Sequence, residues 1–70
     1  MRDDNISNKI INTMISNQAD RFALRTRIIA DNVGITIHQA RYYLEKLRKN
    51  NIVERTTKGR GRKITWLLNN

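Results

Sequence analysis

The chain has 70 residues, which fits a single domain over 1–70, because a chain this short buries only about 60% of its unfolded surface and cannot support two separate cores. Its 14 Lys and Arg against 6 Asp and Glu give a formal net charge of +8, which favours a polyanionic partner. With 39% hydrophobic residues, 6% aromatic residues and no cysteine, the composition argues against a deep catalytic pocket, disulfides and a thiolate metal site.

The N-terminal residues 1–5 lack the basic-then-apolar order of a signal peptide. No apolar run approaches the roughly 20 residues of a membrane span. We therefore expect a cytoplasmic protein with no membrane partner. The positive charge is concentrated in the second half of the chain, since residues 41–63 are rich in Lys and Arg and contain only Glu45 and Glu54 as acids.

Apolar residues recur at helical spacing near the N-terminus and predict a helix that an Asp or Asn among residues 3–5 can cap. Its apolar residues are Ile6, Ile10, Ile11, Met14 and Ile15. The polar segment 17–21 predicts a loop, and residues 22–24 are a candidate for a short strand against a later hairpin.

Two further helices separated by a glycine turn are predicted over about 26–50. Thr26 can cap the first, and Gly34 supplies the left-handed conformation that ends it. Thr36 can cap the second, whose inward positions are Ile37, Ala40, Leu44 and Leu47. The order of helix, tight turn and helix is that of a helix-turn-helix.

A β-hairpin, or wing, is predicted over about 52–68. Ile52 and Val53 begin one strand, residues 56–63 form a basic loop with two glycines, and alternating residues from Ile64 to Leu68 form the return strand. Burial of Trp66 beneath this hairpin is favoured over base stacking. The fold class is therefore mainly α with a small β-hairpin, a winged helix-turn-helix of three helices plus a wing.

The outward face of the helix after Thr36 is polar and net positive. A recognition helix enters the major groove with its N-terminal end leading, so the early residues are the candidates for reading bases. They are His38, Gln39, Arg41 and Tyr42. Gln can pair with adenine N6 and N7, and Arg with guanine O6 and N7. The candidates for contacts to the DNA backbone are Thr36, Lys46, Arg48 and Lys49. The alternative is a basic helix face that is merely solvated.

The loop of the hairpin carries four further bases without an acid between them: Lys58, Arg60, Arg62 and Lys63. This pattern suits a loop that follows a phosphate backbone or inserts Arg60 into a minor groove. The alternative is an ordinary charged hairpin that resists pairing at its edge.

Catalytic and metal-binding patterns are missing from the sequence. His38 has no Cys, His or carboxylate at ligand spacing, and no nucleophile is paired with a base. We therefore expect no cofactor, no metal and no enzymatic activity.

The run of residues 39–44, QARYYL, in the second helix of a helix-turn-helix and followed by a basic loop and a Trp strand, resembles the small pilus-operon regulators of the PapI and FaeA type. The resemblance extends over about residues 6–68. It implies a bacterial, nucleoid-associated regulator of a fimbrial operon, with phase variation, in which Gln39, Arg41 and Tyr42 take the recognition role. Some members of the family act with the leucine-responsive regulatory protein at GATC sites that adenine methylation controls.

The small size of the domain also favours a second protein on the DNA, because one such module buries about 600 to 1,000 Å² and reads only a few base pairs. We therefore expect a monomer or weak dimer that binds double-stranded DNA beside a second DNA-bound protein. Two alternatives remain: a winged-helix domain for protein assembly, whose basic face serves acidic partners, and an RNA-binding basic domain.

Overall fold

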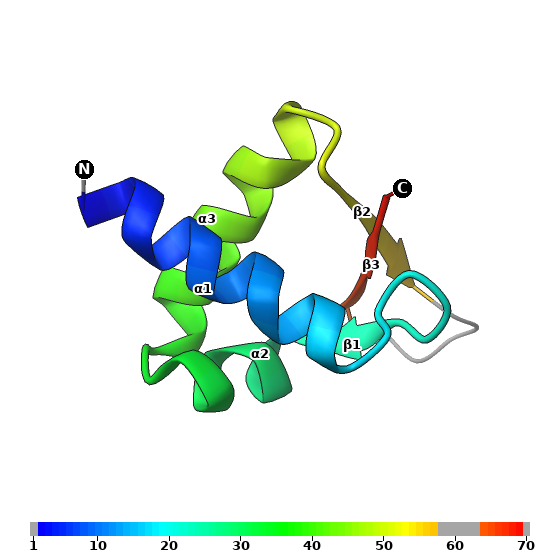
Figure 1. Ribbon diagram of the computed structural model, residues 1–70, viewed down its shortest axis with the longest axis horizontal. Coiled ribbons are helices and arrows are strands. Elements are labelled where there is room, and N and C mark those ends of the chain that lie inside the picture. Colours follow the sequence, from blue (N-terminus) through cyan, green and yellow to red (C-terminus); the bar gives the residue numbers. More distant parts are fainter. Residues whose placement is uncertain (1, 58–63, 70) are drawn as a thin grey trace.

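In the computed structural model, which describes residues 2–57 and 64–69, three helices pack beside a three-stranded antiparallel sheet (Figure 1). In chain order the elements are α1 (Arg2–Ser16), β1 (Leu24–Arg25), α2 (Thr26–Val33), α3 (Ile37–Lys49), β2 (Val53–Thr57) and β3 (Ile64–Leu68). This order confirms the predicted winged helix-turn-helix, in which α2 and α3 form the helix-turn-helix and β2 and β3 form the wing.

Helix α1 ends at Ser16, before the predicted loop, but it differs from its prediction at its start and in the burial of one apolar residue. It begins at Arg2, before the expected cap at residues 3–5. Acidic residues are favourable inside the first turn as well as at the cap, so residue type alone does not fix the start. Ile10 and Met14 are buried as expected, but Ile15 is exposed.

The short strand after α1 begins later in the chain than predicted, because turns occupy the residues before it. The backbone N–H groups of Arg21 and Phe22 both donate to the carbonyl of Gln18, which has a positive φ of 55°. These turns include Phe22, which is exposed. The strand predicted at residues 22–24 therefore exists but covers Leu24–Arg25, and it pairs with β3 at Trp66 and Thr65.

The turn between α2 and α3 forms as predicted at Gly34, whereas the start of α2 does not. Gly34 has a φ of 85°, and its N–H donates to the carbonyl of Ala30 at 2.8 Å. The N-cap of α2 is Arg25, and Thr26 is the first helical residue. Thr26 therefore lies one position past the cap, where it is buried and its hydroxyl accepts from the indole of Trp66.

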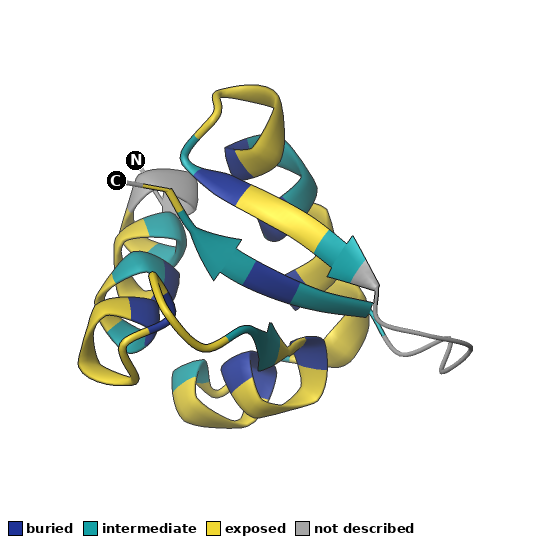
Figure 2. Ribbon diagram, turned by 90° about the vertical axis from the view of Figure 1, so that its right-hand side faces the viewer, coloured by how far each residue is buried: buried dark blue, intermediate teal, exposed yellow. Residues whose placement is uncertain are grey.

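Trp66 lies at the centre of the core. The sheet has the order β1-β3-β2, so β3 is its middle strand, and Trp66 pairs with Leu24 on one side and Arg55 on the other. The predicted burial of Trp66 is confirmed, since it is fully buried. Figure 2 shows that buried positions also lie on all three helices, and the largest of these side chains are Ile10, Met14, Ile29 and Leu44.

Candidate nucleic-acid interface

The first turn of α3 is fixed by a capping box. The Thr36 hydroxyl accepts from the backbone N–H of Gln39 at 3.0 Å, and the Gln39 Oε1 accepts from the backbone N–H of Thr36 at 3.0 Å. Two backbone donors of the helix terminus are satisfied in this way. The predicted cap at Thr36 is confirmed, and the Gln39 side chain lies back along the helix terminus.

The outward face of α3 is accessible along its length. Ala40, Leu44 and Leu47 are buried on the inner face, while the four candidates for base reading are all exposed. A depression on the outward face is lined by His38, Arg41, Tyr42, Glu45, Lys46 and Lys49. The fold thus brings three of the four candidates together with two of the predicted backbone contacts, while Gln39 lies outside the depression.

Ile37 is an exception to the predicted inward face of α3. Its side chain is 45% exposed, although its spacing from Ala40 and Leu44 places it in the same sector. Helical side chains lean toward the N-terminus, so the first residue of a helix extends past the end of the packed region. Ile37 therefore adds apolar surface at the leading end of α3, which the sequence pattern had assigned to the core.

Tyr42 is held by two neighbours on the same helix. Its ring meets that of Tyr43 edge to face, with centroids 5.2 Å apart and planes at 76°. The Lys46 Nζ lies 5.2 Å from the centroid of the Tyr42 ring. Such a cation–π contact contributes about 0.5 to 1 kcal/mol at an exposed site. Because Tyr43 packs against the core, Tyr42 offers a positioned aromatic surface rather than a loose one.

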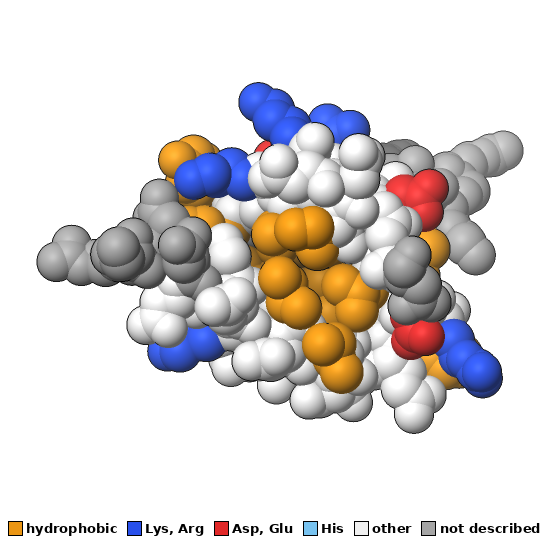
Figure 3. All heavy atoms as spheres, turned by 45° about the horizontal axis from the view of Figure 1, so that its top comes forward, with side chains coloured by type: hydrophobic (Ala, Val, Ile, Leu, Met, Phe, Trp, Pro, Cys, Tyr) orange, Lys and Arg blue, Asp and Glu red, His pale blue; other side chains and the backbone are white. Residues whose placement is uncertain are grey.

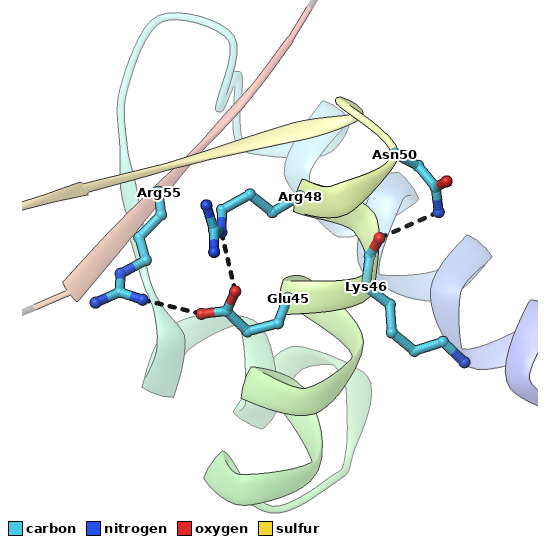
Figure 4. A network of polar contacts seen from close by, with 5 residues as sticks. All are labelled: Glu45, Lys46, Arg48, Asn50 and Arg55. Carbon is cyan, nitrogen blue, oxygen red and sulfur yellow. Dashed lines mark hydrogen bonds and ion pairs between the residues drawn. The ribbon is translucent and has the colours of Figure 1, made fainter.

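An ion-pair network joins α3 to the wing. Glu45 Oε1 accepts from the Arg48 Nε at 2.9 Å, and Glu45 Oε2 accepts from an Nη1 of Arg55, on β2, at 3.0 Å (Figure 4). The hydrogen bond from Arg48, together with the charges of both arginines and the bond from Arg55, lowers the pKa of Glu45 against the opposing effect of burial. Glu45 is therefore a carboxylate at neutral pH.

Arg55 is the residue of this network that sequence reasoning missed. It lies ten positions after Glu45, so their contact depends on how the chain turns between α3 and β2. The sequence gives one local signal for a role of Arg55, which is that it is the single basic residue in the strand Val53–Thr57, shortly after the basic last turn of α3.

The end of α3 is closed by Asn50. Its side-chain Nδ2 donates to the carbonyl of Lys46 at 3.1 Å (Figure 4). The Ile52 N–H donates to the carbonyl of Leu47 at 2.9 Å. Asn51 has a positive φ of 63°, which turns the chain into β2. Arg48 and Lys49 lie exposed on the last turn, where cations also interact favourably with the helix dipole.

The bases of the hairpin loop, Lys58, Arg60, Arg62 and Lys63, lie outside the described residues. The strands on either side of them pair from Val53 with Leu68 to Thr57 with Ile64, which confirms the hairpin. Near its loop end the Thr56 and Thr65 hydroxyls lie 2.8 Å apart in a hydrogen bond.

A second hollow, between α1 and the end of α3, is lined by Ser7, Asn8, Ile11, Lys46, Leu47, Asn50 and Ile52. Figure 3 brings the top of Figure 1 forward and shows hydrophobic side chains gathered in the middle of that face, with Lys and Arg side chains toward its edges. Lys46 borders both hollows. The second hollow thus adjoins the outward face of α3 through Lys46.

Within residues 2–57 and 64–69, no group of three or more His, Cys, Asp or Glu is placed to hold a metal ion. None of the helices in this described part is long and apolar enough to cross a membrane.

The three helices, the glycine turn and the hairpin define the chain as a winged helix-turn-helix protein. The model of the family described as FaeA-like protein matches residues 6–70, and the chain therefore belongs to this family. The match confirms the resemblance predicted from QARYYL. No curated protein matches the chain. The family indicates a regulator of a fimbrial operon, and it is not a family of enzymes.

Proposed function

We propose that the protein is a transcriptional regulator that binds double-stranded DNA at a fimbrial operon, with α3 in the major groove and the wing on the backbone or in the minor groove. It acts in the bacterial cytoplasm, on the nucleoid. Membership of the FaeA-like family supports the assignment to a fimbrial operon. The net charge of +8 supports binding to a polyanion such as DNA.

The observation that carries the proposal is the outward face of α3. One side of this helix is buried in the core through Ala40, Leu44 and Leu47, which holds the helix rigidly. The other side exposes polar, basic and aromatic side chains around one depression. An α-helix of this kind fits the width of the major groove, where base edges are distinguishable.

Within this face, base reading falls to the leading residues. His38, Arg41 and Tyr42 present their side chains together, and Ile37 adds an apolar surface of the kind that contacts a thymine methyl group. The Gln39 amide has one acceptor already engaged by the backbone of Thr36, which orients the side chain for its amide nitrogen to donate. Lys46, Arg48 and Lys49 on the later turns contact phosphates, with Thr36 at the leading end.

Selectivity for a promoter is shared with a second protein. One winged-helix module buries about 600 to 1,000 Å² on DNA and reads few base pairs. The family resemblance supports the leucine-responsive regulatory protein as this partner, and phase variation through adenine methylation at GATC as the context. The adenine N6 group lies in the major groove, within the region that α3 reads.

Selection of bound sequences from a random pool of DNA duplexes tests the function directly. We expect an enriched motif, and a changed enrichment when the pool carries N6-methyladenine. Recovery of an unbiased pool contradicts sequence-selective binding. Tighter binding to RNA duplexes than to DNA supports the RNA alternative, and no affinity for either supports protein assembly.

Two single substitutions separate base reading from anchoring. Arg41→Ala is expected to weaken the selected site by about 1 to 3 kcal/mol more than a random duplex. Lys49→Ala, on the last turn, is expected to weaken both duplexes alike, because phosphates are the same in every sequence. Equal losses for both duplexes with Arg41→Ala contradict its role in base reading.

A further inference from the structure

We propose that Glu45, Arg48 and Arg55 form a binding site for one phosphodiester group of the DNA backbone, at the junction of α3 and the wing. The proposal rests on the duplex binding proposed above. It adds a contact from β2, Arg55, and assigns a role to Glu45, an acidic residue on an otherwise basic face.

The hydrogen-bond geometry leaves both arginines able to bind a second anion. The carboxylate of Glu45 takes one nitrogen from each, the Nε of Arg48 at 2.9 Å and an Nη1 of Arg55 at 3.0 Å. A guanidinium carries five N–H donors in a planar fork. Each arginine therefore keeps donors for a phosphate oxygen while one of its edges is fixed by the carboxylate.

The exposure of the three side chains also supports a phosphate site. Arg48 is 47% exposed and Arg55 is 42% exposed, whereas Glu45 between them is 29% exposed. The two guanidinium groups are thus more open to solvent than the carboxylate that holds them. A ligand arriving from solution meets the arginines before it meets Glu45.

The charges of the cluster match a phosphodiester. Two guanidinium groups and one carboxylate carry a net charge of +1, and a phosphodiester carries a charge of −1. Glu45 is ionised at neutral pH, because its pKa lies below 4.5, so this balance holds there. Without its two partners, a carboxylate at this position would repel DNA, because it lines the depression on the outward face of α3.

The position of the cluster suits a backbone contact rather than a base contact. Arg48 is in the last turn of α3, about three helical turns after Ile37 at the leading end, and Arg55 is on β2. Figure 4 shows Arg48, from α3, and Arg55, from β2, both pointing toward Glu45. In the proposed complex, a DNA strand that passes from the recognition helix to the wing crosses this junction. Phosphate contacts from two elements also fix the angle at which α3 enters the groove.

The test is a salt titration of binding to one fixed mixed-sequence DNA duplex. It uses the wild type, Arg48→Ala, Arg55→Ala, the double variant, and Arg21→Ala as a matched control in the turn after α1. Neutralising one phosphate contributes about 0.9 to the slope of log K against log salt. A shared phosphate predicts that the double variant loses about 0.9 in slope, that each single variant loses less, and that Arg21→Ala loses none.

Three results overturn the inference while leaving DNA binding intact. A loss of about 1.8 in the double variant means that the arginines contact separate phosphates. An unchanged slope, with thermal unfolding at a lower temperature, means that the network is only a brace between α3 and β2. A loss of about 0.9 in one single variant, with none in the other, means that one arginine alone contacts the phosphate and that the site is not shared. Absence of salt-dependent duplex binding by the wild type instead refutes the proposed function.

Discussion

The indole Nε1 of Trp66 donates a hydrogen bond of 2.8 Å to the hydroxyl of Thr26, which joins the middle strand of the sheet to the first residue of α2. Both residues are buried. An indole has one N–H donor, and a buried donor without a partner costs stability. This bond therefore ties the wing to the helix-turn-helix through the centre of the core.

Replacing Thr26 with Val tests this tie. Val keeps the shape of the side chain but removes the acceptor, so the buried indole N–H loses its partner. We expect the free energy of unfolding to fall by about 1 to 3 kcal/mol, as measured by urea denaturation. Thr26→Ser keeps the hydroxyl and serves as the control. Equal losses for Val and Ser would mean that packing, and not the hydrogen bond, is what Thr26 contributes.

Gln39 has two roles that one pair of substitutions separates. Its Oε1 belongs to the capping box with Thr36, and its amide nitrogen is the group proposed to contact a base. Gln39→Glu keeps an acceptor at this position and therefore keeps the box, since Glu is the other residue that forms it. Gln39→Ala removes both groups.

We therefore expect Gln39→Glu to unfold at nearly the same temperature as the wild type but to lose affinity for the selected DNA site. Gln39→Ala is expected to lose affinity and also up to about 1 kcal/mol of stability, as for other lost caps. Thermal unfolding and binding to the selected and random duplexes give both readouts. A Gln39→Glu variant that still discriminates between the duplexes would leave Gln39 with the capping role alone.

The network around Glu45 predicts a dependence of stability on pH. Its pKa is lowered from 4.5 in the folded state, chiefly by the hydrogen bond from Arg48, so the folded protein binds fewer protons here than the unfolded chain. The stabilisation is present above pH 4.5 and is lost as the pH falls through the lower folded pKa. Because the pairs are partly exposed, its size is roughly 0.2 to 1 kcal/mol.

Glu45→Gln removes this dependence. We expect the variant to be less stable than the wild type at neutral pH and equally stable once Glu45 is protonated in both the folded and unfolded wild type, in urea denaturation at a series of pH values. Glu54→Gln, an exposed acid on the strand that carries Arg55, controls for the loss of one negative charge. A difference between Glu45→Gln and wild type that stays constant down to strongly acidic pH would contradict the ion pairs as its cause.

Features decided within a few residues could be predicted from the sequence. The left-handed turn at Gly34 and the cap at Thr36 depend on the residue itself and on neighbours up to four positions away. Thr26 shows the limit of such reasoning, because a Thr before an apolar run suits a cap, yet its hydroxyl is taken by Trp66, forty positions later in the chain. A tertiary hydrogen bond replaced the local one.

The same limit applies to the candidate site. The exposed positions of His38, Arg41 and Tyr42 follow from helical periodicity, which the sequence displays. The partnership of Glu45 with Arg55 does not, since it requires the path of the chain through Asn51 into β2. Charge counts alone therefore predict a basic face, but they do not predict that Glu45 within it forms an ion pair with Arg55.

Ile37 and Leu44 provide the clearest contrast between periodicity and structure, because the sequence assigns both to the inward face of α3. Leu44 is fully buried, whereas Ile37 is 45% exposed. Leu44→Ala leaves a cavity in the core and is expected to cost about 2 to 5 kcal/mol, a large share of the stability of so small a domain. Ile37→Ala is expected to cost roughly 1 kcal/mol or less, since exposure limits the loss and Ala is the better helix former.

Urea denaturation of the two variants checks this difference, and it decides what their DNA binding means. If Ile37→Ala folds like the wild type, any loss of affinity for the selected site reflects a surface contact. The same loss in Leu44→Ala follows from unfolding alone. Comparable destabilisation by both substitutions would return Ile37 to the core, in agreement with the periodicity, and would remove it from the surface that we propose to face the DNA.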